Sequence, residues 1–202
     1  MTTPHLALIE TIQDLHQRGW CDGTGGNFSV VLKRDPITLL MAPSGVDKGK
    51  VSAEMLIEVN SEGAVVSGTG RASAETLMHL KIVDVCGSGA VLHTHSANAT
   101  LLSKRALSDG AIELEGWEML KGLEGVTTHD TRVNIPVIAN DQDLPGLCRA
   151  ATPRLHKAPH GLLVAGHGLY AWGSTLNEAR RHVEILEYLL DLHYKQLVLG
   201  MQ

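Results

Sequence analysis

The sequence predicts an α/β protein whose sheet is antiparallel or mixed, because two β-hairpins follow one another in its first third. Apolar runs at residues 30–32 and 37–41 flank a turn that contains Pro36, and those at residues 56–59 and 64–66 flank a second turn. Consecutive hairpins make neighbouring strands antiparallel, which excludes a sheet built only from β-α-β units. A length of 202 residues with 44% hydrophobic content fits one domain with a substantial core, so we assign residues 1–202 to a single domain.

The other elements follow from the spacing of apolar residues. From Leu6 to Leu15 they recur at helical spacing, ahead of Gly19, which predicts an amphipathic helix at residues 5–18. Ser73 is in position to cap a helix that begins at residue 74. Further helices are expected at residues 96–107, within 144–155 and from 176 to about 199, and further strands at residues 90–95, 134–138 and 162–165.

Composition excludes several classes of partner. A net charge of −5, a pI near 6.1 and scattered lysines and arginines give no basic field for nucleic acid. No apolar run approaches the roughly 20 residues that span a bilayer, and the N-terminus lacks the pattern of a signal peptide. Three separated cysteines, an odd number, argue against a disulfide framework. We therefore expect a cytoplasmic protein without a nucleic-acid or membrane partner.

A pair of histidines, His93 and His95, is the strongest chemical signal in the sequence. In a strand at residues 90–95 the two imidazoles point to the same face, about 7 Å apart along the chain. A catalytic zinc site usually takes three protein ligands. His167 is the best third candidate, because it follows an apolar strand and lies between two glycines. The competing interpretation of the pair alone is an ordinary surface or core pair.

Two polar loops are candidates for binding phosphate. Residues 22–29 hold three glycines within four positions and lead to Asn27, and residues 42–48 contain Ser44 and Gly45 just after a predicted strand. Backbone N–H groups and short polar side chains in such loops can form a nest for an anion. Neither loop is a Walker motif or a dinucleotide fingerprint. By itself, each loop is also compatible with an ordinary turn.

Several acidic residues could supply an acid or base. Glu75 is expected in the first turn of a helix that leads into the histidine strand. Glu113, Glu115 and Glu118 lie among apolar residues, and Glu118 would share a helical face with Lys121 if that stretch were helical. A solvated acidic face is the competing interpretation, and composition does not choose among the three glutamates.

Together, these motifs resemble the class II aldolase/adducin family in kind and in order. The motifs are GGNFS at residues 25–29, PSG at 43–45, SAE at 73–75, HTH at 93–95 and GHG at 166–168. The resemblance implies a central, mostly antiparallel sheet between layers of helices, and a zinc-dependent sugar-phosphate enzyme, often a C4 tetramer with active sites at subunit interfaces. It further implies one Zn²⁺ per subunit on His93, His95 and His167, and phosphate contacts from Asn27, Ser44, Gly45 and Ser73.

Within the family, residues 42–48, 73–77, 118–121 and 168–173 are most similar to its dehydratases. That similarity implies that Glu118 is the acid/base in dehydrating a sugar phosphate through a metal-stabilised enediolate, and we expect its surroundings to raise its pKa. In the family's aldolases the glutamate that matches Glu75 takes this role, so the roles of Glu75 and Lys121 stay open. The alternatives are a zinc-dependent aldolase or epimerase, and a metal-free interaction module such as the head region of adducin.

Overall fold

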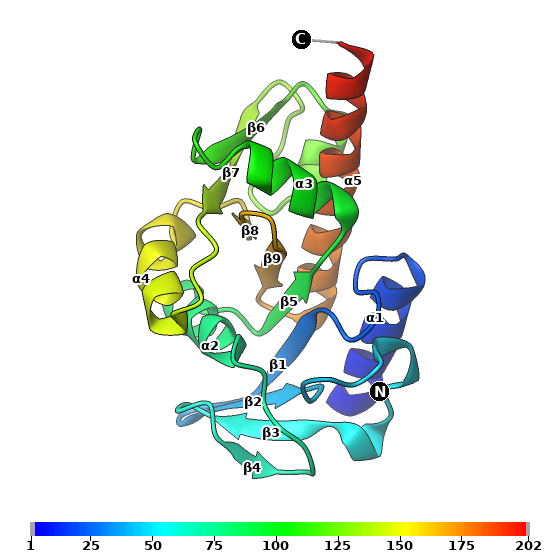
Figure 1. The fold of residues 1–202 in the computed structure, drawn as a ribbon, viewed down its shortest axis with the longest axis vertical. Helices are drawn as coiled ribbons and strands as arrows, with labels where there is room; N and C mark the ends of the chain where they lie inside the picture. Colours follow the sequence, from blue (N-terminus) through cyan, green and yellow to red (C-terminus); the bar gives the residue numbers. More distant parts are fainter. Residues whose placement is uncertain (1–2, 201–202) are drawn as a thin grey trace.

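The computed structural model describes residues 3–200, which form the helices and strands labelled in Figure 1. The helices are α1 (Pro4–Gln17), α2 (Thr76–Cys86), α3 (Ala97–Arg105), α4 (Leu144–Leu155) and α5 (Leu176–Leu199). The strands are β1 (Asn27–Arg34), β2 (Ile37–Met41), β3 (Ile57–Asn60), β4 (Val65–Ser67), β5 (Ala90–Thr94), β6 (Ala111–Glu115), β7 (Arg132–Ile138), β8 (Gly161–Val164) and β9 (Gly168–Gly173). Three short 3-10 turns are η1 (Lys48–Lys50), η2 (Ala53–Met55) and η3 (Glu118–Gly122).

All nine strands belong to one sheet, in the order β4-β3-β2-β1-β5-β9-β8-β7-β6. Neighbouring strands are antiparallel except β7 and β8, which are parallel. Both predicted hairpins form, as β1 with β2 and β3 with β4. The prediction of a mostly antiparallel central sheet is therefore confirmed.

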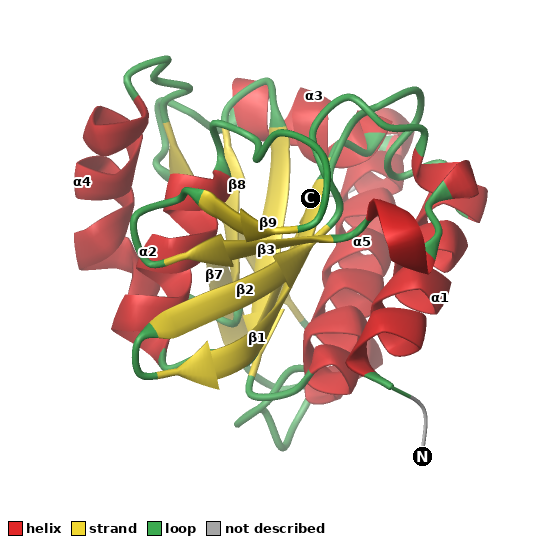
Figure 2. Ribbon diagram, turned by 90° about the horizontal axis from the view of Figure 1, so that it is seen from below, coloured by secondary structure: helices red, strands yellow, loops and turns green. Residues whose placement is uncertain are grey.

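Helices cover both faces of this sheet and give the molecule three layers (Figure 2). One apolar core joins α1, α3 and α5 to the sheet, with Leu8, Leu102 and Leu186 among its buried side chains. The second core lies on the opposite face beneath α2 and α4, and includes Met78 and Leu147. Because each helix has one apolar stripe, each can cover only one face of the sheet.

Two segments differ from the elements predicted from the sequence. The strand β9 was not predicted, although it is buried along its whole length between β5 and β8. Glycines stand at both of its ends, and its two faces pack against different cores, so it lacks the alternation of a strand with one solvent face. Residues 111–115 form an edge strand, so Glu113 and Glu115 lie on β6 and only Glu118 starts a helical turn.

The strand β5 lies in the middle of the sheet, directly between β1 and β9. All five of its residues are buried, including His93. His93 therefore projects from a strand whose backbone is paired on both sides, and His95 follows the last residue of that strand. Within residues 3–200, none of the helices combines the length and the apolar character needed to cross a membrane.

Candidate active site

The sheet brings His167 to the histidine pair. His93 lies opposite Tyr170 in the register of β5 with β9, and His167 lies in the turn between β8 and β9. Gly168 makes this approach possible, because a methyl group there would come within 2.0 Å of the Thr94 carbonyl oxygen. The flanking glycine predicted to allow a close approach does so in the structure.

The three imidazoles point their Nε2 atoms at one another. His95 Nε2 lies 2.8 Å from His93 Nε2, which lies 3.3 Å from His167 Nε2. His93 Nδ1 is 2.9 Å from the carbonyl oxygen of Leu169, which only accepts, so Nδ1 carries the proton and Nε2 offers its lone pair. Such a second hydrogen bond is what orients a histidine toward a metal.

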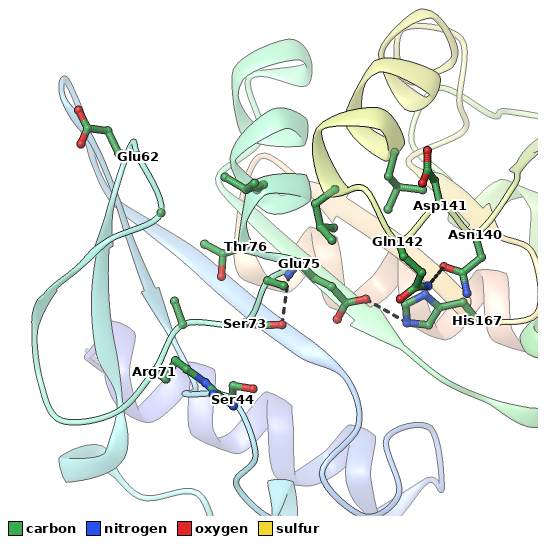
Figure 3. A pocket seen from close by; sticks show the side chains of 16 residues that line it. Ser44, Glu62, Arg71, Ser73, Glu75, Thr76, Asn140, Asp141, Gln142 and His167 are labelled. Carbon is green, nitrogen blue, oxygen red and sulfur yellow. Dashed lines mark hydrogen bonds and ion pairs between the residues drawn. The ribbon is translucent and has the colours of Figure 1, made fainter.

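Glu75 completes the cluster from the start of α2. Its Oε1 lies 3.0 Å from His167 Nε2 (Figure 3). The same oxygen lies 3.6 Å from His93 Nε2 and accepts a hydrogen bond from the Tyr170 hydroxyl. Its other oxygen accepts from the Asn27 amide. Burial alone would raise the pKa of Glu75, but the contacts with His167 and His93 outweigh burial and hold the pKa well below its usual range. Glu75 is therefore an ionised carboxylate facing three imidazoles.

This donor set fits a divalent metal ion. The ligand atoms of Glu75, His93, His95 and His167 all lie within 4.8 Å of one another. Zinc–nitrogen bonds of about 2.0–2.1 Å in a tetrahedron place ligand atoms about 3.3 Å apart, and the cluster needs little adjustment to reach that spacing. Burial and the neighbouring histidines lower the pKa of His95 to about 3, so its imidazole is neutral, the form that binds metal.

A cavity of about 750 Å³ opens beside the metal-binding cluster (Figure 3). Glu75 and His167 lie at one side of it, and Ser44, Ser73 and Arg71 at another. The backbone N–H of Ser44 donates to the Arg71 carbonyl oxygen, so the loop at residues 42–47 and the segment before α2 lie together. Two of the four predicted phosphate residues, Ser44 and Ser73, therefore line this cavity.

The other two phosphate candidates are not among the described residues that line it. Gly45 follows Ser44 with a φ of +79°, and Asn27 is held by Glu75. Ser73 is not the helix cap, since Glu75 occupies that position and Ser73 Oγ accepts from the Glu75 N–H.

Arg71 also lines the cavity and was not predicted from the sequence. A cation two residues before the SAE motif is the signal that could have identified it.

Glu118 does not lie with the histidines in this chain. Its side chain is 67% exposed at the start of η3, where it pairs with Lys121 and lies 3.4 Å from His129. It is absent from the described residues that line the cavity at His167. The hydrogen bond from Lys121 lowers the pKa of Glu118, so the predicted rise is wrong for the single chain.

A second group, made of Glu124, His160 and His182, also brings possible ligands within 4.8 Å. The rings of His160 and His182 are stacked, with centroids 4.4 Å apart and an angle of 25° between their planes. Lone pairs in two nearly parallel rings do not converge on one point. His182 also accepts from the Glu124 N–H and contacts the Trp172 carbonyl oxygen, so this group is part of the scaffold.

Glu187 on α5 supports the histidine strand from the opposite face of the sheet. It is 3% exposed and accepts hydrogen bonds of 2.6 Å and 2.5 Å from the hydroxyls of Thr94 and Ser96, the two residues that flank His95. Burial raises the pKa of Glu187 to about 7, against the hydrogen bonds from these hydroxyls. The carboxyl group therefore holds a proton in the folded chain at pH values where an unfolded chain releases it.

The raised pKa of Glu187 predicts a specific pH dependence of stability. Between about pH 4.5 and pH 7 the folded chain binds more protons at Glu187 than the unfolded chain does. The contribution of Glu187 to the free energy of unfolding is therefore complete below pH 4.5 and is lost as the pH rises through 7. This loss of unfolding free energy amounts to roughly 3 kcal/mol. We expect Glu187→Gln to remove this dependence, so that the variant gains stability relative to the parent chain from pH 5 to pH 8. Urea unfolding of both chains at each pH measures the difference, and a constant difference would contradict the prediction.

The chain belongs to the class II aldolase and adducin family. The family described as "Class II Aldolase and Adducin N-terminal domain" matches residues 6–194. A methylthioribulose-1-phosphate dehydratase from Pectobacterium carotovorum is 44% identical over 198 residues, covering 96% of this chain and 94% of the relative. One from Xanthomonas campestris is 42% identical, covering 95% and 88%. The solved L-fuculose-1-phosphate aldolase of Thermus thermophilus superposes with a TM-score of 0.77 at 27% identity, over 97% of this chain and 96% of that one.

Proposed function

We propose that this chain dehydrates 5-methylthioribulose 1-phosphate to 2,3-diketo-5-methylthiopentyl 1-phosphate, a step of methionine salvage. The observation that carries the proposal is the similarity, over nearly the whole chain, to relatives that are named methylthioribulose-1-phosphate dehydratase. The reaction removes a proton from C3 and a hydroxyl from C4 of the sugar and releases them as water. The site must therefore hold the sugar phosphate, make the C3 proton acidic and move one proton.

His93, His95 and His167 are proposed to hold one Zn²⁺ per subunit, with Glu75 beside them. A divalent metal ion at this position supplies Lewis acidity toward the oxygens of a sugar. The His93 imidazole is oriented by the Leu169 carbonyl oxygen, and the backbone at His95 is held by the Trp20 carbonyl oxygen at 2.7 Å. The three imidazoles can therefore bind a metal without large rearrangement.

The phosphate group is proposed to bind at the Ser44 and Ser73 side of the cavity, together with Gly45 and Asn27. Arg71 is the one Lys or Arg among the described residues lining this cavity, and its guanidinium can pair with two phosphate oxygens at once. A phosphate held there would leave the rest of the sugar to extend toward His167 and Glu75. This placement brings the carbon atoms that react close to the metal-binding cluster.

Glu118 is proposed as the acid/base, acting across an interface between two copies of the chain. Within one copy it is exposed and lies outside the cavity at His167, so it can serve that cavity only from another subunit. A C4 tetramer with active sites at subunit interfaces fits this requirement. Burial at the interface would raise the pKa of Glu118, and a nearby Lys121 would oppose that effect.

The test is to offer two sugar phosphates to the zinc-loaded protein. We expect 5-methylthioribulose 1-phosphate to yield the diketone, detected by its absorbance and mass, and L-fuculose 1-phosphate to yield no aldehyde. Aldehyde from the second substrate, without diketone from the first, would instead favour the aldolase reaction. Glu75 is the specific feature that makes that reaction the second candidate, since its carboxylate lies directly at the cluster.

A further inference from the structure

Lys48 is a charged side chain in the interior to which the proposed reaction gives no role. It is 1% exposed, and its ammonium group donates hydrogen bonds to the carbonyl oxygens of Thr24 and Val46, at 3.0 Å and 3.2 Å. Burial lowers the pKa of Lys48, although Cys21 and Asp47 act in the opposite direction. A lysine is seldom buried to this extent without a carboxylate partner.

Asp47, next to Lys48 in the sequence, does not form an ion pair with this ammonium group. The carboxylate of Asp47 accepts from the Gly49 N–H at 3.0 Å and pairs with the exposed Lys50 at 3.3 Å. Burial raises the pKa of the Cys21 thiol to about 12, so this thiol is neutral and offers Lys48 no negative charge. In the part of the chain that the structure describes, the hydrogen-bond partners of Lys48 are therefore neutral carbonyl groups, and no carboxylate forms an ion pair with it.

The two carbonyl groups belong to the two loops proposed to surround the phosphate. Thr24 lies in the glycine-rich loop that leads to Asn27, and Val46 follows Ser44 and Gly45. The glycine-rich loop also packs against the metal-binding cluster, since a methyl group at Gly25 would come 3.0 Å from His95 Nδ1. Lys48 thus connects one phosphate loop to the other, next to a metal ligand.

We propose that Lys48 is a positioning residue for substrate phosphate: it holds the two loops at the spacing a phosphate dianion requires and supplies a buried positive charge beneath them. The inference rests on the proposed function, because it assigns the phosphate to these loops. Lys48 itself is too deeply buried to contact the ligand. Its effect is therefore expected in the binding of phosphate and in KM more than in kcat.

Three variants test this role. Lys48→Met removes the charge and both hydrogen bonds and keeps the length of the side chain, and Lys48→Arg keeps the charge and the donors. Lys50→Met is the matched control, because Lys50 lies two residues away, is 82% exposed and carries the same charge. Each zinc-loaded variant is assayed for KM, kcat, zinc content, melting temperature and the affinity for inorganic phosphate by calorimetry.

For Lys48→Met we expect the KM to rise and the phosphate affinity to fall by about tenfold or more. The variant loses the charged hydrogen bonds from Lys48 to the two loops, and the loss of one such bond corresponds to about a factor of ten. The kcat is expected to change less than about threefold, and zinc content to be unchanged. Removal of a buried charge that has no ion-pair partner should leave the melting temperature equal or higher. Lys48→Arg should recover most of the phosphate affinity, and Lys50→Met should behave as the parent chain.

Other outcomes overturn the inference. If Lys48→Met binds phosphate as well as Lys50→Met does, the ammonium group does not position the loops. If Lys48→Met loses its zinc or its circular dichroism spectrum, or if Lys48→Arg behaves as Lys48→Met does, Lys48 serves folding and not phosphate binding. A parent chain that binds phosphate but yields no diketone would contradict the proposed function and leave the test of Lys48 by calorimetry intact.

Discussion

The variant His167→Ala is expected to lose its zinc and at least about a thousandfold in kcat/KM. His167 is one of three proposed ligands, and a catalytic zinc site with two remaining imidazoles holds its metal weakly. A metal ion held there would supply several kcal/mol of transition-state stabilisation as a Lewis acid, and each 1.36 kcal/mol corresponds to a factor of ten in rate. Elemental analysis after dialysis measures the metal, and formation of the diketone measures the activity.

The control is His156→Ala, which removes an exposed histidine at the end of α4. We expect that variant to keep both its zinc and its activity. If His167→Ala retained a full equivalent of zinc, the third ligand would be wrongly identified. Glu75 would then be the first alternative, since its carboxylate lies within 3.0 Å of His167 Nε2 and 3.6 Å of His93 Nε2.

Glu118→Gln is the second substitution with a large expected effect, a loss of about 10²- to 10⁴-fold in kcat. Glutamine keeps the size of the side chain and cannot carry the proton. Zinc content should be unchanged, because the Glu118 carboxylate pairs with Lys121 and His129 and not with the three histidines. The assay follows single turnovers of diketone formation in zinc-loaded protein.

Glu75→Gln is the informative comparison for Glu118→Gln. If Glu75→Gln lost turnover with its zinc intact while Glu118→Gln stayed active, the acid/base would be Glu75. That result would match the aldolases of the family. If only Glu118→Gln lost turnover, the dehydratase assignment would gain direct support.

Subunit mixing tests whether Glu118 acts across an interface. A Glu118→Gln subunit keeps the three histidines, and a His167→Ala subunit keeps Glu118. If the two groups meet between subunits, unfolding and refolding the two inactive variants together should restore activity at some sites, whereas each variant refolded alone should remain inactive. Failure of the mixture to regain activity, despite mixed oligomers detected by native mass spectrometry, would rule out the action of Glu118 in trans.

Much of the site could be predicted because its signals are local. The apolar run before His93 predicts a strand, and its alternation places His93 and His95 on one face, although His95 lies one residue beyond the end of β5. Gly166 and Gly168 mark the third histidine, because Gly166 has a φ of +66° and Gly168 lies too close to the Thr94 carbonyl oxygen for a side chain. The two N-terminal hairpins were predicted for the same reason, since turn residues and short apolar runs act over a few positions.

Tertiary structure decided what depends on distant segments. The meeting of His93 with His167, 74 positions apart, results from the pairing of β5 with β9, a strand that local periodicity did not reveal. Residue type alone left Glu75 and Glu118 equivalent, and only the fold places one at the histidines and the other on an exposed turn. The burial of Lys48 likewise depends on two loops packing over it. Sequence therefore determined which groups are available for chemistry, because that depends on residue type and short-range spacing. Tertiary structure determined which of them face each other, because long-range pairing and burial are properties of the whole chain.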